Sequence, residues 1–139
     1  MIEKSCGTLP YTVRNGEICY LLIRAKDSCV CGFPKGHVEP NETEIETALR
    51  ETFEETSLTV TVTDGFRYET SYPMNNGNVK SVVYFLADFK DGQPKHNDGF
   101  EDFEHLILPF DQAYQMLTFD NTKDLLKKAN DFMTAKSNI

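Results

Sequence analysis

The stretch Pro34–Leu58 is PKGHVEPNETEIETALRETFEETSL, a loop with glycine and proline followed by an amphipathic helical pattern. Six glutamates fall between Asn41 and Thr56, and Arg50 is the single basic residue among them. Asn41 is a favourable N-cap, and Glu44 stands three residues later, as in a capping box. The stretch therefore predicts a helix from Asn41 to Thr56 whose first acids suit the positive end of the helix dipole.

The acids of the last turns need a different explanation, because the dipole disfavours them there. At about 100° per residue, Glu51, Glu54 and Glu55 share one side of the helix. Arg50, paired with Glu46 or Glu54, would offset only part of their repulsion. This face is either simply solvated or a site for a hard cation such as Mg²⁺, which prefers oxygen ligands. The opposite side is the expected core face, made of Ile45, Ala48, Leu49, Thr52, Phe53 and Thr56.

Composition and charge narrow the class of protein. The 139 residues are most simply one domain, 1–139, long enough to bury a core. A net charge of −8 makes duplex nucleic acid and anionic membranes poor partners. The sequence has neither a signal-peptide pattern nor an apolar run of about 18 residues, so we expect a cytoplasmic protein. We expect a monomer or a weak dimer that binds a small molecule.

Strand and helix patterns alternate along the chain. Asn15-Gly16 between apolar runs predicts a β-hairpin. The sequence favours further strands over 57–72, 79–89 and 105–110, and helices over 110–118 and 122–134. Such interleaving predicts an α/β fold, with helices on both sides of a mixed sheet in an α/β/α sandwich.

The spacing within the opening stretch resembles the Nudix box, G-x5-E-x7-R-E-U-x-E-E-x-G-U, where U is a bulky apolar residue. The matching positions are Gly36, Glu42, Arg50, Glu51, Glu54, Glu55 and Leu58. Thr52 replaces an apolar residue, and Ser57 replaces a glycine that lies just past the helix end, where φ > 0 is common. The order of the flanking strands also agrees, so the resemblance covers essentially the whole chain and implies the Nudix-type sandwich.

Members of that family hydrolyse a nucleoside diphosphate linked to another group, by attack of water on phosphorus. The resemblance implies a Mg²⁺ cofactor, with Mn²⁺ as an alternative. The implied ligands are Glu51, Glu54, Glu55, the backbone carbonyl of Lys35 and a late-loop acid, Glu101 or, failing that, Glu104. Glu54 is our candidate for the base that takes the proton of the water. Arg50 is expected to orient the acids, and Gly36 to permit a tight turn.

A narrower resemblance concerns the substrate. PKGHVEP, ETALRET, DGFRYETSY and VVYFLADF are similar to segments of the asymmetric diadenosine tetraphosphate hydrolases, which implies a dinucleoside polyphosphate cut to ATP and AMP. That group often has Trp where this chain has Val30 and Cys31. The expected substrate contacts are Lys35, His37 and Lys80 with phosphate and Tyr84 with adenine. Alternatives are a nucleotide sugar, a damaged nucleoside triphosphate, the 5′ end of RNA, or a non-catalytic module that binds a nucleotide.

Overall fold

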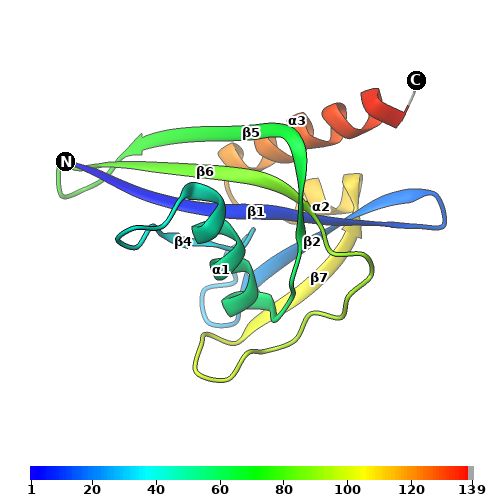
Figure 1. Ribbon diagram of the computed structural model, residues 1–139, viewed down its shortest axis with the longest axis horizontal. Helices are drawn as coiled ribbons and strands as arrows, with labels where there is room; N and C mark the ends of the chain where they lie inside the picture. The colour runs from blue at the N-terminus through cyan, green and yellow to red at the C-terminus, as the bar shows by residue number, and fades with distance from the viewer. Residues whose placement is uncertain (138–139) are drawn as a thin grey trace.

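The computed structural model describes residues 1–137 and has helices on both sides of a mixed, seven-stranded sheet (Figure 1). The expected α/β/α sandwich is therefore confirmed. Over residues 1–137, no helix combines the length and the apolar character needed to cross a membrane. The elements are, in order, β1 (Ile2–Arg14), β2 (Glu17–Ala25), β3 (Cys31–Gly32), β4 (Lys35–His37), α1 (Glu44–Thr56), β5 (Thr61–Pro73), β6 (Val79–Asp88), β7 (Phe103–Pro109), α2 (Phe110–Met116) and α3 (Asp120–Ser137).

Strand β1 organises the sheet because it pairs along both of its edges. One edge runs parallel to β6 from Ile2 to Tyr11. The other pairs antiparallel with β2 through the predicted hairpin, where Asn15 and Gly16 have φ of 52° and 78°. Closer to its start, the same edge pairs with β4, so that Gly7 lies opposite Lys35. This pairing brings the short strand β4 into contact with α1.

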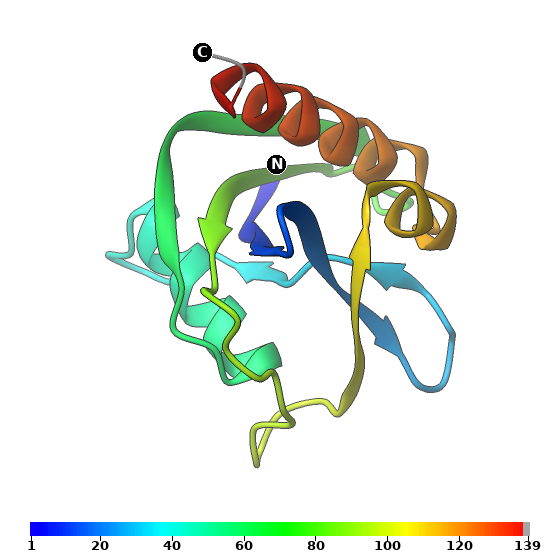
Figure 2. The same ribbon diagram turned by 90° about the vertical axis from the view of Figure 1, so that its right-hand side faces the viewer.

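The central strand β6 is buried on both faces, as its continuous apolar run requires. Val82, Tyr84 and Leu86 pack into the main core, which includes buried residues of α2 and α3. Val83 and Phe85 face the other way and pack with Ala48 of α1. Figure 2 shows α1 and α3 on different sides of the sheet. The sheet thus separates the main core from the site-bearing helix.

The start of α1 differs from the prediction. The N-cap is Thr43 rather than Asn41, and its Oγ1 accepts a hydrogen bond from the Glu46 N–H at 3.1 Å. The Glu46 carboxylate accepts one in return from the Thr43 N–H at 2.8 Å, which completes a capping box shifted by two residues. Asn41 instead has φ of 70° in the preceding turn, a conformation that asparagine tolerates well.

The core face of α1 was also only partly predicted. Its buried residues are Thr47, Ala48, Thr52 and Thr56, whereas Ile45 and Phe53 are 41% and 48% exposed. The helix packs on β1 through small side chains, and Thr52 Oγ1 lies 2.7 Å from Thr8 Oγ1. Such a narrow contact leaves the larger side chains at the rim.

Glu44 takes no part in the capping box and instead pairs with basic side chains of the sheet. Its carboxylate accepts hydrogen bonds from Arg67 Nε and Nη2 at 3.0 and 2.8 Å and pairs with Lys4. The hydrogen bonds from Arg67 and then from Lys4 lower the pKa of Glu44 from 4.5 to about 2. The ionised carboxylate therefore stabilises the folded state, and this contribution is lost as the pH falls from about 4.5 towards 2.

We predict that Glu44→Gln lowers the free energy of unfolding at pH 7 by on the order of 1 kcal/mol. The difference from the unsubstituted protein should shrink below pH 4.5 and vanish near pH 2. Urea denaturation at several pH values measures it, with the exposed Glu17→Gln as a control of near-zero effect. A difference that stayed constant with pH would contradict the assignment.

Candidate active site

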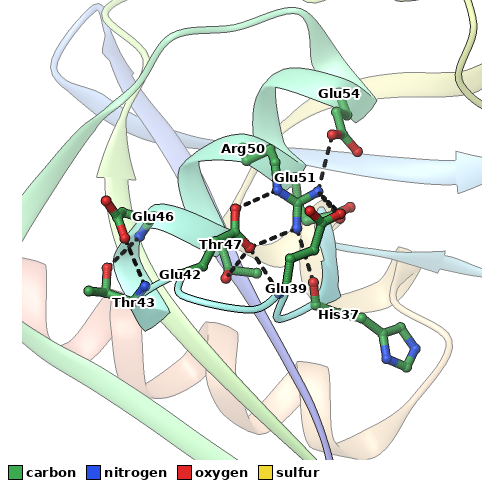
Figure 3. A network of polar contacts seen from close by, with 9 residues as sticks. All are labelled: His37, Glu39, Glu42, Thr43, Glu46, Thr47, Arg50, Glu51 and Glu54. Carbon is green, nitrogen blue, oxygen red and sulfur yellow. Dashed lines mark hydrogen bonds and ion pairs between the residues drawn. The ribbon is translucent and has the colours of Figure 1, made fainter.

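Arg50 is the centre of the acidic face of α1 (Figure 3). Its Nε and Nη2 donate to the two carboxylate oxygens of Glu42 at 2.7 and 3.0 Å, a bidentate pair. Its Nη1 donates to Glu51 at 2.7 Å and to Glu54 at 3.1 Å. Glu54 was one of the two expected partners of Arg50. The other, Glu46, was wrong because that side chain closes the capping box.

The same guanidinium connects the helix to the last residue of β4. Arg50 Nη2 also donates to the His37 backbone oxygen at 3.0 Å. The hydrogen bonds from Arg50 are the main cause that lowers the pKa of Glu42 to about 2. Glu42 is thus held ionised, and it anchors Arg50 so that the opposite edge of the guanidinium is left for Glu51 and Glu54.

Gly36 provides the space for Glu51. A Cβ atom at this position would lie 2.0 Å from Glu51 Cδ, closer than any real contact. Gly36 is not among the residues with positive φ, so the expected role in a tight turn was wrong. Any side chain at this position would displace the Glu51 carboxylate from its place against the backbone of β4.

The carboxylate of Glu55 is the most enclosed of the cluster. The Lys35 N–H donates to its Oε1 at 3.1 Å. Burial raises the pKa of Glu55 to about 8, and the charge of Glu51 adds to this effect. Burial also raises the pKa of Glu51, with a contribution from the neighbouring Glu54. Both ionised carboxylates are therefore disfavoured, even though the Arg50 guanidinium lies beside Glu51.

These residues fit a hard divalent cation by donor type, burial and charge. The oxygen donors of Glu51, Glu54 and Glu55 lie on one helical face, and two of them carry unfavourable buried charge. Within residues 1–137, however, no three His, Cys, Asp or Glu side chains are already gathered as a metal cage. Arg50 holds Glu51 and Glu54 instead.

A cleft with two cavities adjoins the acids. The smaller, of about 220 Å³, reaches Glu55 and is lined by Val30, Cys31 and Phe103 among others. The larger, of about 510 Å³, extends towards Tyr72 and Asn121. The two share the lining residues Lys35, Tyr84, Phe119 and Thr122. The cleft therefore leads from the buried acid to aromatic side chains contributed by β5 and by the α2–α3 junction.

Comparison with known proteins identifies the family that has this arrangement. The NUDIX domain model matches residues 7–129. The chain belongs to the NUDIX domain family. This Nudix hydrolase is 34% identical over 143 residues to the asymmetrical bis(5′-nucleosyl)-tetraphosphatase of Rattus norvegicus, covering 96% of this chain and 97% of that protein. The Sus scrofa enzyme of the same name is 33% identical with equal coverage.

Solved structures agree with the family assignment. The binary complex of a C. elegans Ap4A hydrolase superposes on the Nudix chain with a TM-score of 0.86 and 28% sequence identity. The match covers 96% of this chain and 98% of that one. The fold that positions Arg50 and the box glutamates is thus shared over essentially the full length.

Ser57 stands where the Nudix box has glycine. It adopts the left-handed conformation, with φ of 62° and ψ of 14°, and its N–H donates to the Phe53 carbonyl at 2.8 Å. The backbone conformation expected of the family is kept. With serine instead of glycine, this conformation lowers the stability of the fold by on the order of 1 kcal/mol.

We predict that Ser57→Gly raises the free energy of unfolding by on the order of 1 kcal/mol. Asn41→Gly is the matched control, since Asn41 also has positive φ, at 70°. Its gain should be smaller because asparagine tolerates this conformation better than serine does. Thermal and urea denaturation measure both, and a destabilised Ser57→Gly would contradict the prediction.

The two late acids of the Nudix chain differ in their partners. Glu104 is bound by Arg24, whose Nε and Nη2 donate to it at 3.2 and 2.9 Å. Glu101 lies exposed in the loop before β7, and its charge contributes to the raised pKa of Glu55. Glu101 therefore remains the better candidate for a ligand, and Glu104 is committed to an ion pair.

The expected substrate residues occupy different positions. Lys35 lines both cavities. Lys80 is 6% exposed, and its Nζ lies 3.4 Å from His37 Nε2, so these two side chains meet across the start of β1, which pairs with β4 on one edge and with β6 on the other. Burial, and then the charge of Lys35, lower the pKa of Lys80. Lys80 thus lies close to both other basic residues, whereas only Lys35 lines the cleft.

The stacking role expected for Tyr84 was wrong. Tyr84 is only 3% exposed, and its ring packs edge-on against Phe33, with centroids 6.4 Å apart. It forms the floor of the cleft, since β6 is buried on both faces. Phe119 and Tyr72 are 54% and 41% exposed and line the larger cavity, yet the sequence did not single them out. An aromatic residue in a polar junction, as in Thr118-Phe119-Asp120, is the pattern that could have indicated the first.

Proposed function

We propose that this Nudix hydrolase cleaves diadenosine tetraphosphate into ATP and AMP with the help of Mg²⁺. The observation that carries the proposal is the cluster of partly buried acids held by Arg50, next to a cleft with exposed aromatic side chains. The similarity to asymmetrical bis(5′-nucleosyl)-tetraphosphatases extends over 96% of the chain and supports the substrate.

Mg²⁺, with Mn²⁺ as the alternative, would be held by Glu51, Glu54, Glu55 and the Lys35 carbonyl, together with Glu101. When bound, a divalent cation neutralises phosphate charge and lowers the pKa of water. The chain itself supplies the orientation of the donors. Arg50 fixes Glu51 and Glu54 from one side, and the Lys35 N–H fixes Glu55 from another.

Glu54 is the carboxylate best suited to take a proton from the attacking water. Glu42 is committed to a bidentate pair with Arg50, and partial burial raises the pKa of Glu55 to about 8. Glu54 accepts the longest of the four hydrogen bonds that Arg50 donates to carboxylates, at 3.1 Å, and its side chain is 22% exposed. It can therefore reach a water molecule while the hydrogen bond from Arg50 fixes its orientation.

The substrate would lie along the cleft from the acids to the aromatic side chains. Lys35, Lys80 and His37 would bind phosphate oxygens, and the buried ammonium of Lys80 contacts His37 rather than a carboxylate. Phe119 and Tyr72 would stack on adenine, a contribution of about 1–3 kcal/mol per base. Tyr84 would contact the substrate only as part of the cleft floor.

A different nucleotide is the alternative substrate. Val30 and Cys31 line the smaller cavity where the diadenosine tetraphosphate hydrolases often have Trp. A nucleotide sugar, a damaged nucleoside triphosphate or the 5′ end of RNA would use the same acids. A non-catalytic module would bind a nucleotide tightly and release no product. Cytoplasmic location, a monomeric or weakly dimeric state, and the lack of membrane and duplex partners stay predictions.

Ion-exchange analysis of the products after incubation with diadenosine tetraphosphate and Mg²⁺ tests the proposal. We expect ATP plus AMP, and no products in EDTA. Two ADP molecules would contradict asymmetric cleavage. Absence of turnover would contradict the substrate, and a panel of nucleotide sugars, damaged triphosphates and capped RNA would then separate another hydrolase from a binding module.

A further inference from the structure

The last turn of α1 is held by residues 95–105, which we call the capping segment. Figures 1 and 2 show this part of the chain beside the end of the helix. Three helix carbonyls accept hydrogen bonds from it: that of Phe53 from Asn97 Nδ2 at 3.2 Å, that of Glu55 from His105 Nε2 at 3.1 Å, and that of Thr56 from the Lys95 N–H at 2.9 Å. The helix end is thus capped from 39 to 50 residues further along the chain.

This end of the helix needs external support. The last four carbonyls of any helix lack partners within it. Here the last turn carries Glu54 and Glu55 and no basic residue. The negative end of the helix dipole therefore repels these two carboxylates. Ser57 continues the chain in a left-handed conformation that is costly for serine. The N–H donors of Asn97, Lys95 and His105 oppose the accumulated negative charge.

The contact of His105 bears most directly on the acids. A carbonyl only accepts hydrogen bonds, so Nε2 of His105 carries the proton. It donates a hydrogen bond to the backbone carbonyl of Glu55. The Lys35 N–H fixes the carboxylate of the same residue. Glu55 is therefore held at its backbone from β7 and at its side chain from β4. Glu101 belongs to the segment that makes these contacts.

We propose that His105 and Asn97 are positioning residues, which fix the last turn of α1 so that Glu54 and Glu55 keep their positions relative to Glu101. The inference rests on the proposed function, since the acids are taken to hold a divalent cation. Two side chains outside the Nudix box would then determine how accurately the acids of the site are positioned. Groups that orient metal ligands commonly change metal affinity by about 10–100-fold when they are removed.

The test measures Mn²⁺ affinity of the nucleotide-free protein, from the electron paramagnetic resonance of free Mn²⁺. His105→Leu removes the donor, and we expect it to weaken binding at least about tenfold. It should also lower kcat more than it changes KM. His105→Gln can donate through its amide, so it should recover most of the affinity. Faster hydrogen exchange of the amides of residues 55–58 in His105→Leu would locate the effect.

Tyr20→Phe is the matched control for a general loss of stability. It removes one partly buried side-chain hydrogen bond, of 2.6 Å to Asn130, between β2 and α3. We expect unchanged Mn²⁺ affinity for this variant. Should His105→Leu fail to fold, Asn97→Asp decides, because it replaces the donor to Phe53 with an acceptor and lies in an exposed loop.

The outcomes separate the inference from the function beneath it. If the unsubstituted protein binds Mn²⁺ and the position 105 or 97 variants bind it equally well, the inference is overturned and the proposed function stands. If Tyr20→Phe weakens binding as much as His105→Leu, the effect is general destabilisation and the inference is again overturned. If the unsubstituted protein binds no Mn²⁺, the metal of the proposed function and the inference are both overturned.

Discussion

Glu54→Gln should lower kcat for diadenosine tetraphosphate by about 10²–10⁴-fold and leave KM nearly unchanged. The amide keeps the shape of the side chain and an oxygen for Arg50 Nη1, now 3.1 Å from Glu54. It cannot take up a proton at neutral pH. Because the substitution removes an interaction that acts only in the transition state, kcat and kcat/KM should fall together. Steady-state kinetics at saturating Mg²⁺ measures both.

Glu46→Gln is the matched control for that experiment. Glu46 is on the same helix, and its carboxylate accepts a hydrogen bond from the Thr43 N–H at 2.8 Å. Glutamine fills the same position of a capping box, so stability and activity should both be retained. A Glu54→Gln enzyme with kcat within about threefold of the unsubstituted protein would exclude Glu54 as the base and direct the assignment to Glu51.

The box spacing was sufficient to predict α1 and the side on which its acids lie. Helical periodicity alone brings Glu51, Glu54 and Glu55 to one face. The cap was misplaced because Asn41 and Thr43 are both good N-caps, each with a glutamate three residues on. Only the tertiary pairing of Glu44 with Arg67 distinguishes them, and that contact joins residues 23 apart.

The parts that the sequence did not predict depend on contacts between distant segments. The first half of β1 contains Lys4 and Gly7 and shows no alternation, yet it forms because β6 and β4 pair with it. The cleft takes Tyr72 from β5 and Phe119 from the α2–α3 junction. Nothing in the sequence around His105 indicates that its ring reaches the Glu55 carbonyl.

Arg50→Met should destabilise the protein strongly, and more than Arg67→Met does. Arg50 donates to three carboxylates and to the His37 carbonyl, and its side chain is 25% exposed. Methionine fills similar space without a charge. Glu42 and Glu51, 18% and 14% exposed, would then face each other without a cation. Breaking such a partly buried pair costs about 3–5 kcal/mol, and we expect the lower end of that range.

Arg67→Met is the matched control, since Arg67 also makes a bidentate pair, with Glu44, at 3.0 and 2.8 Å. Its side chain is 45% exposed, so water screens the acid left behind. The free energy of unfolding of Arg67→Met should fall by on the order of 1 kcal/mol. If urea denaturation gave equal decreases in the free energy of unfolding for both variants, Arg50 would not stabilise the partly buried acids as we infer.

The same pair of variants separates the two ways in which negative charge can be balanced in this site. Mg²⁺ should raise the stability of Arg50→Met more than that of Arg67→Met, because a cation among Glu51, Glu54 and Glu55 replaces part of the missing positive charge. The activity of Arg50→Met should nevertheless stay low, since a cation neutralises the acids without fixing their orientation. Stabilisation by Mg²⁺ that was identical in both variants would mean that the cation binds elsewhere than at the acids that Arg50 holds.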